Sequence, residues 1–340
     1  MTYRFKLQEP IALGVRCVGI EQLDIAAARL GSKDDIPAAI HDARRCLKRL
    51  RALLRLIRPG LGDAAYRREA KRLTGTGKLL SGARDLFVMQ QTLAKLEDRF
   101  GAMPNGGAER LRKLLAQGHA RGRRSGPDAR RQALQRLDQA RRLFTGKAAD
   151  GIELEHVVDG LETVYRKARK AFRHAYREPS DETFHAWRKK VQVHWRHMSL
   201  LSRGWPEALS ARAGEAKELS RLLGEDHDYS VLLAFAAGEG ASRLEPQDIA
   251  ALAERCRACQ ADLRAQARPR GERLFAERAD DLKERVTLYW TSAGCLAAMA
   301  PAKDQEAAKS QGPRQRGSSK GERQGQRKTL RNTRYRRRAS

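Results

Sequence analysis

The chain repeats a basic helical pattern that begins with a histidine, and this duplication constrains its fold more than any other feature. The first copy, H-D-A-R-R-C-L-K-R-L-R-A-L-L-R, covers residues 41–55, and a weaker copy, H-A-W-R-K-K-V-Q-V-H-W-R, begins at His185. A second shared signal follows each copy, L-L-S-G-A-R-D at 79–85 and L-L-G-E-D-H-D at 222–228. Two matched signals in the same order, with nearly equal offsets, indicate an internal duplication.

Helical periodicity extends over nearly the whole chain, and we find no convincing run of alternating strand residues. Breaks rich in Gly and Pro fall where helix hairpins would turn, which leaves roughly four helices in each repeat. From about residue 300 the sequence consists of Gln, Gly, Ser, Lys and Arg, with almost no large apolar residue. Such a segment buries too little surface to offset its ordering entropy, so we predict a disordered tail after an all-α chain.

The first basic segment predicts an amphipathic helix with a continuous cationic stripe. With His41 placed at zero on a helical wheel, five cations fall within roughly 80° of it on either side. These cations are Arg44, Arg45, Lys48, Arg51 and Arg55. The opposite side collects the apolar residues Ile40, Ala43, Leu47, Leu50, Leu54 and Ile57. Like charges at this spacing repel one another, which indicates either a solvated face or a surface for a polyanion.

The second copy predicts a similar helix with fewer cations. Arg188, Lys189 and Arg196 share the face of His185, while Gln192 stands where the first copy has Lys48. Its apolar side is formed by Phe184, Trp187, Val191, Met198 and Leu201. His194 points to that side and is therefore predicted to be a buried structural histidine. We expect the two stripes to line one groove or channel, where their fields add.

The net charge of the chain is +28, and most of it lies outside the tail. The tail holds 13 Lys and Arg against 3 Asp and Glu, so the other 300 residues keep a net charge of +18. A charge this large predicts attraction to nucleic acid, an anionic membrane or a polyphosphorylated partner. Few, irregularly spaced cysteines and the lack of an apolar span or signal peptide favour a cytoplasmic protein that does not bind membranes.

The repeated segments resemble the conserved histidine α-helical domain family, CHAD. In that family a histidine is followed by Arg or Lys at +3, +4, +7 and +10 in both halves, with an L-G-x-x-x-D motif downstream. The first half matches at His41, Arg44, Arg45, Lys48 and Arg51, and at S-G-A-R-D in 81–85. The second half matches over 184–197 and 223–228, and the resemblance covers about residues 5–295.

The resemblance implies two four-helix bundles related by pseudo-twofold symmetry, with a basic central surface that binds inorganic polyphosphate. It implies binding without catalysis, no cofactor or resident metal, and association with polyphosphate granules in the cytoplasm. We accordingly assign residues 1–148 to a first helical-bundle repeat, 149–300 to a second, and 301–340 to a disordered tail rich in Arg and Lys.

Eleven side chains of the two stripes are expected to bind polyphosphate. They are His41, Arg44, Arg45, Lys48, Arg49, Arg51, Arg55, His185, Arg188, Lys189 and Arg196. Arginine makes bidentate bonds to phosphate oxygens and lysine adds point charges. The histidines are expected to add charge at mildly acidic pH, which would strengthen binding.

Acids inside such a groove would repel phosphate, so they need another role. We expect Asp85 and Asp228 to pair with and orient arginines, with Arg84 supporting the first copy. A divalent metal at Glu225, Asp226 and Asp228 is the alternative for the second copy. The first copy offers only Arg84–Asp85 there, which weakens any symmetric metal site.

Two other functions remain open from the sequence. A nucleic-acid-binding protein would use the same stripes and the basic tail. Recognition of RNA or single-stranded DNA usually adds aromatic stacking platforms, but aromatic residues make up only 6% of the chain. Trp187 falls on the apolar side, so Trp195 is the candidate platform near the stripes. An enzyme of polyphosphate metabolism is disfavoured because no cluster of acids is repeated.

Overall fold

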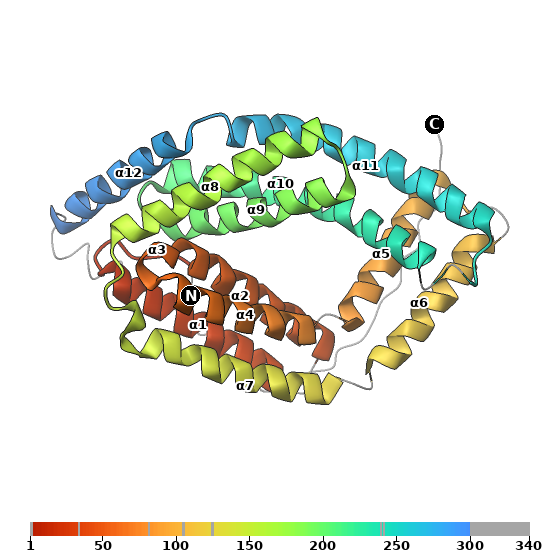
Figure 1. Cartoon of the computed structure of the whole chain (residues 1–340), viewed down its shortest axis with the longest axis horizontal. Helices are drawn as coiled ribbons and strands as arrows, with labels where there is room; N and C mark the ends of the chain where they lie inside the picture. The colour runs from red at the N-terminus through yellow and green to blue at the C-terminus, as the bar shows by residue number, and fades with distance from the viewer. Residues whose placement is uncertain are drawn as a thin grey trace, which may run out of the picture. The chain divides into compact units, whose positions relative to one another are not determined.

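The computed structural model describes residues 3–32, 35–80, 82–103, 106–123, 126–238, 240 and 242–299, without the side chains at 82–85, 118–123 and 126–127. Within these residues every regular element is a helix (Figure 1), which confirms the predicted all-α class. The predicted disordered tail lies outside the described residues. None of the helices in the described part combines the length and apolarity needed to cross a membrane.

Four helices of the first repeat pack together around one core. They are α1 (Ile11–Gly31), α2 (Ile36–Leu56), α4 (Asp63–Leu79) and α7 (Gly126–Thr145), with the short α3 (Arg58–Leu61) after α2. The start of α2 is fixed by Asp35, whose side chain accepts a hydrogen bond from the Ala38 amide at 3.1 Å. The apolar side predicted for this helix is buried, with Leu47, Leu50 and Leu54 at most 2% exposed.

The helices of the second repeat form a contiguous group in the same way. They are α8 (Leu154–Arg177), α9 (Asp181–Leu201), α10 (Pro206–Ala237), α11 (Pro246–Leu274) and α12 (Ala279–Met299). A capping box of Ser180 and Thr183 begins α9. Asp181 lies in the first turn of this helix, where its negative charge interacts favourably with the helix dipole. Trp187 and Phe184 are buried as predicted and contact each other, and the rings of Phe172 in α8 and Phe275, directly after α11, lie beside Trp187.

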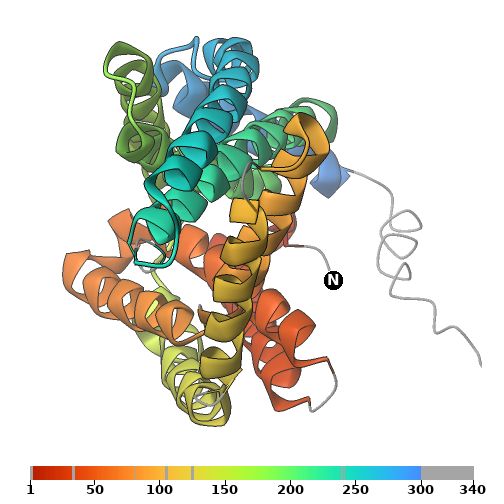
Figure 2. The same ribbon diagram turned by 90° about the vertical axis from the view of Figure 1, so that its right-hand side faces the viewer.

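The hairpin of α5 (Gly82–Phe100) and α6 (Gly107–Arg123) packs on helices of the second repeat. A separate apolar cluster joins Leu93 of α5 and Leu111 of α6 to Leu232 of α10 and Leu252 of α11. This arrangement arises because α10 has 32 residues, or about 48 Å of helix, so its C-terminal half extends to the hairpin (Figures 1 and 2). The α5 and α6 helices of the first repeat therefore bury their apolar side chains against helices of the second repeat.

The two repeats meet where α2 contacts α8 and α9. Ala52, Val164 and Val193, one from each helix, form a small buried apolar cluster. Beside it, Nε2 of His197 lies 2.9 Å from the backbone oxygen of Ala52 and donates a hydrogen bond to it. Gly160 of α8 lies against the backbone of Leu56, so a Cβ at this position would be only 1.8 Å from the Leu56 oxygen.

The contact at Gly160 gives a first prediction about stability. Replacement of Gly160 by Ala should lower the free energy of unfolding by about 1–3 kcal/mol, because rigid backbone cannot move aside for the methyl group. Urea titration followed by circular dichroism measures this change.

Gly77→Ala in α4 is the matched control, because nothing lies within 4 Å of its Cβ position. The control should be neutral or more stable by up to about 1 kcal/mol. Equal stability of the two variants would contradict the close approach.

Candidate functional site

The cations of the first stripe lie together on α2 and approach those of α9. Lys48 is close enough to Arg188 for their charges to interact, and Arg51 interacts in the same way with Arg196. Farther along, Arg55 approaches Lys190 of α9. The two cationic helices therefore lie against each other. We define the cationic face by the side chains of Arg44, Lys48, Arg51, Arg55, Arg188 and Lys189.

Lys48 lies at the centre of this face, and its charged form is disfavoured there. Desolvation, followed by the guanidinium groups of Arg188, Arg196, Arg44 and Arg51, together lower the pKa of Lys48 to about 8. Lys48 nevertheless keeps an exposed surface. Because water reaches Lys48, repulsion by the arginines is the better supported of the two causes of its lowered pKa. An anion placed here would relieve that repulsion.

The arginine three residues after each histidine contacts the second shared signal of its own repeat. Arg44 donates a hydrogen bond at 2.9 Å to the backbone oxygen of Leu80, within the segment 79–85. Arg188 lies across Gly224, with Nε 3.6 Å from the position of a Cβ there. The charge of Asp228 raises the pKa of Arg188, although burial outweighs this and lowers it overall. The order of the repeated motifs thus reflects a contact between them in both halves.

His185 stacks on another histidine and differs from the expectation of a freely titrating group. Its ring lies 3.9 Å from that of His227, with an interplanar angle of 26°. Burial lowers the pKa of His185, and Lys189 and Arg188 lower it further. Burial also lowers the pKa of His227 to about 3, with a further contribution from Arg188. The surroundings of His185 thus disfavour its charged form, whereas the sequence predicted that this histidine adds charge at mildly acidic pH.

Three of the other predicted cations have partners within the protein. Arg45 pairs with Asp42 at 3.1 Å and is turned toward the side where Arg29 of α1 also contacts Asp42. Arg49 donates to Gln22 at 3.1 Å and covers the ring of Tyr3. Arg196 is only 7% exposed and donates to the backbone oxygen of Gln192.

His41 is exposed at the end of the stripe. The side chains of Arg84 and Asp85 lie outside the described residues.

The acids of the segment 222–228 point to different partners. Glu225 pairs with Lys95 of α5 at 2.6 Å and with Arg221 at 3.1 Å. Asp226 is buried and accepts a hydrogen bond at 2.6 Å from Nε of Arg264. Among the residues that the structure describes, no group of three or more His, Cys, Asp or Glu side chains is arranged to hold a metal ion. The separate partners argue against the metal alternative at Glu225, Asp226 and Asp228.

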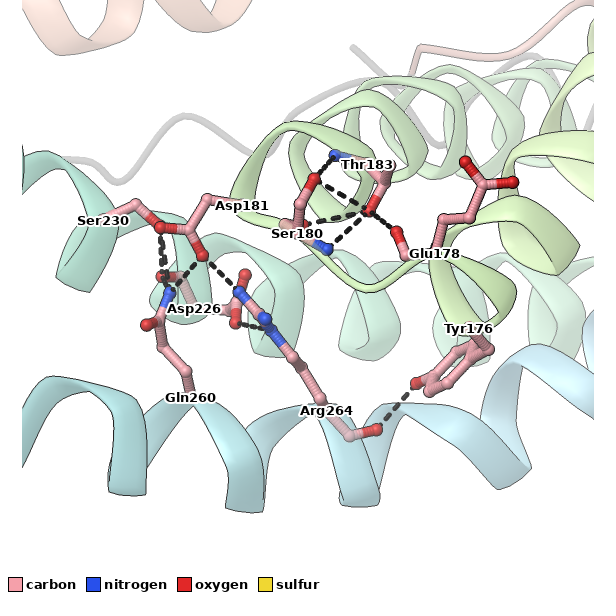
Figure 3. A network of polar contacts seen from close by, with 9 residues as sticks. All are labelled: Tyr176, Glu178, Ser180, Asp181, Thr183, Asp226, Ser230, Gln260 and Arg264. Atoms are coloured by element: carbon pink, nitrogen blue, oxygen red, sulfur yellow. Dashed lines mark hydrogen bonds and ion pairs between the residues drawn. The ribbon is translucent and has the colours of Figure 1, made fainter. Parts of the chain in front are cut away.

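A polar network ties this segment to the beginning of the stripe helix α9 (Figure 3). Arg264 of α11 bridges Asp226 and Asp181, with a distance of 2.5 Å to the Asp181 carboxylate. Gln260 donates to the same carboxylate at 3.0 Å and to the hydroxyl of Ser230 at 2.9 Å. The buried acid Asp226, which the sequence analysis considered only as a metal ligand, thus holds α9, α10 and α11 in register.

Two histidines of α9 are buried and structural. His194 is fully buried, as predicted, and its Nε2 accepts a hydrogen bond from Arg212 at 3.2 Å. His197 is also fully buried, with its Nε2 donating to Ala52. Burial lowers the pKa of His194, and it lowers that of His197 to about 3 despite the hydrogen bond to Ala52. Both rings are therefore neutral at physiological pH.

A pocket of about 350 Å³ opens at the end of the cationic face. Its lining includes Arg55 and Lys189 of the face, together with three further cations, Arg58, Lys167 and Lys190. Sequence reasoning missed these three. Lys190 does not share the face of His185 on a helical wheel, and Arg58 and Lys167 lie outside both repeated motifs, so no repeat signal marked them.

Comparisons with known proteins agree on the fold. A family model described as CHAD domain matches residues 20–237. The structure of PptA from Streptomyces chartreusis is similar at a TM-score of 0.54 and 18% identity, covering 79% of this chain and 100% of that one. The CHAD domain from the plant Ricinus communis is similar at a TM-score of 0.51 and 17% identity, covering 82% and 95%. A comparison with curated proteins finds no significant match.

The buried histidines give a prediction about pH. The pKa of His197 is lower in the folded than in the unfolded chain, so the unfolded state binds more protons between about pH 6.5 and 3. The free energy of unfolding should therefore fall as the pH falls through this window. Each such histidine contributes about 1.4 kcal/mol per pH unit. In His197→Gln, the slope between pH 6 and 5 should be smaller by about that amount.

Urea titrations at pH 7, 6 and 5 measure these slopes. The control is His174→Gln, which removes an imidazole whose side chain is 42% exposed. If His197→Gln and the wild-type protein lost stability equally between pH 6 and 5, the buried, neutral state of His197 would be wrong.

Proposed function

Because the chain belongs to the CHAD domain family, we propose that it binds inorganic polyphosphate along the cationic face of α2 and α9, without catalysing a reaction on it. The observation that carries this proposal is the concentration of like charge on that face. Within the described residues, no carboxylate forms an ion pair with Lys48, Arg51 or Arg55. Repelling cations held together by the fold bind an external polyanion strongly, because the repulsion is relieved on binding.

The chemistry of the face suits a ligand that consists of phosphate alone. Arg51 and Arg55 supply planar guanidinium groups for bidentate contacts with phosphate oxygens, and Lys48 supplies a point charge. Polyphosphate has no bases, so charge density and phosphate spacing are its only recognisable features. The acids near the face do not oppose this, because Asp226 and Glu225 are engaged with cations of the protein.

Trp195 disfavours the alternative of single-stranded nucleic-acid recognition. The guanidinium of Arg196 lies 4.5 Å from the centre of its ring and the Lys217 ammonium 5.9 Å. Its indole nitrogen is buried, and the residue packs against the main apolar core. The partial burial of Trp195 and the two cations beside its ring disfavour the stacking of a base on it. Contacts to phosphate remain as the means by which this face recognises a ligand.

The same acids bear on whether the site is catalytic. A hydrolytic or phosphotransfer site would need a group free to activate water or to hold a metal beside the chain. Asp226 is bonded to Arg264, and the charge of Asp228 interacts with Arg188. We therefore propose a binding module that acts where polyphosphate accumulates, in cytoplasmic granules.

Competition binding tests this function. At about 150 mM salt, where exposed charges are strongly screened, labelled long-chain polyphosphate should bind the full chain and resist displacement by duplex DNA or RNA at equal phosphate concentration. The double variant Lys48→Gln/Arg51→Gln should bind at least roughly tenfold more weakly, because two charge-assisted contacts are lost.

The matched control is Lys71→Gln/Arg142→Gln, which removes two exposed cations from α4 and α7. It should bind polyphosphate almost as tightly as the wild-type chain. Equal displacement by DNA or RNA would show a general cationic surface and would favour the nucleic-acid alternative. Equal losses in the two double variants would place binding away from the cationic face.

Proton uptake gives an independent prediction. At pH 8 about half of Lys48 is protonated in the free protein, because its pKa is about 8. Bound phosphate raises that pKa, so the complex holds more protons than the separate partners. Binding of long-chain polyphosphate at pH 8 should take up roughly half a proton more in the wild-type chain than in Lys48→Gln. Affinity should accordingly fall as the pH rises from 8 to 9.

Isothermal titration calorimetry in two buffers of different ionisation enthalpy measures this uptake. At pH 6.5 Lys48 is protonated in both states, and the difference between wild type and Lys48→Gln should vanish. Equal uptake by the two proteins at pH 8 would mean that phosphate does not approach Lys48.

A further inference from the structure

The pocket at the end of the cationic face draws cations from three separate parts of the fold. Arg55 and Arg58 come from α2 and α3, Lys167 from α8, and Lys189 and Lys190 from α9. Tyr66 and Thr163 add hydroxyl groups, and among the residues that the structure describes no carboxylate lines the pocket. Its volume of about 350 Å³ lies at the lower end of the range for small-ligand sites.

The inner wall of this pocket is apolar and closed. Val164 and Val193 line it and are 6% and 8% exposed. Behind them, Ala52 completes the buried cluster at which α2, α8 and α9 meet. A ligand therefore cannot pass inward between α2, α8 and α9, because packed side chains fill the space beneath the pocket.

The charges in the pocket are arranged for an anion. Burial lowers the pKa of Lys190, and Arg55, Lys167 and Lys189 lower it further. Within the described part of the chain, none of these three lysines forms an ion pair with a carboxylate. Lys190 is thus half-buried among like charges, and it costs folding free energy unless an anion is present.

Arg58 differs from the lysines because it is already held in place. Its Nε donates to Asp63 at 2.8 Å, and its guanidinium lies 4.8 Å from the centre of the Tyr66 ring. These contacts orient the planar fork before a ligand arrives, which reduces the entropy lost on binding. Asp63 itself does not line the pocket.

We propose that this pocket receives the terminal phosphate of a polyphosphate chain, an inference that rests on the proposed function. A terminal phosphate carries up to two negative charges, as phosphate monoesters do, whereas an internal phosphate carries one. A pocket lined by five cations over an apolar floor favours the group of higher charge. Since Arg55 and Lys189 belong to both the pocket and the cationic face, a chain along the face ends in the pocket. A free oligophosphate shares this chemistry.

Capping of the chain ends tests this inference. The probes are a short-chain polyphosphate of defined length, the same polymer capped at both ends as phosphoramidates of a small neutral amine, and tripolyphosphate. At about 150 mM salt the full wild-type chain should bind the uncapped polymer roughly tenfold more tightly than the capped one. The double variant Lys167→Gln/Lys190→Gln should bind the two polymers equally, and more weakly than the wild-type chain binds the uncapped polymer. It should also lose tripolyphosphate binding.

Lys71→Gln/Arg142→Gln again serves as the control and should keep the preference for uncapped ends. Displacement of uncapped short chains by tripolyphosphate from the wild-type chain would show that the pocket also accepts a free oligophosphate. If the wild-type chain bound capped and uncapped polymers equally, or if the pocket variant kept the preference, the inference would be wrong. Polyphosphate binding itself would then stand, whereas failure of every polymer to bind would overturn the proposed function.

Discussion

The contact of α2 with α8 and α9 is the interaction on which the cationic surfaces depend. Two helices that each carry a row of cations repel each other, so an apolar contact must hold them together. Ala52, Val164 and Val193 provide it, and the hydrogen bond from His197 to Ala52 adds a directional constraint. Gly160 lets α8 approach the end of α2. The repulsion between Lys48 and its arginine neighbours therefore persists in the folded protein and is available to a polyanion.

The buried polar groups around α9 have a supporting role. Asp226 and Asp181 share Arg264, which fixes the beginning of α9 against α10 and α11. Arg188 then lies across Gly224, close to Asp228. The acids near the cationic face thus hold Arg264 in position and interact with the charge of Arg188. Similarity at 17% and 18% identity to two solved structures shows that this helical arrangement recurs in distant sequences.

Much of the fold followed from the sequence, because helical periodicity and burial are local properties. Leu47, Leu50 and Trp187 were assigned to buried faces from spacing alone, and His194 was recognised as structural for the same reason. The packing of the α5–α6 hairpin on the second repeat was not anticipated, because nothing local specifies that Leu93 packs on α10 and α11. Arg45 and Arg196 fell on the predicted stripe by angle, yet Asp42 holds the first and burial removes the second from the surface.

The sequence by itself determined that the chain is helical, that its basic motifs are duplicated, and that one side of each stripe helix is apolar. These follow from residue order, since one helix turn sets which side chains share a face. Only the tertiary structure decided which cations meet. Lys167 and Arg58 join Lys190 in one pocket because α3, α8 and α9 converge there. The pKa of His185 is lowered because folding buries its ring beside His227 and brings Lys189 and Arg188 close to it. Electrostatic environment depends on distances between helices, which the linear pattern does not contain.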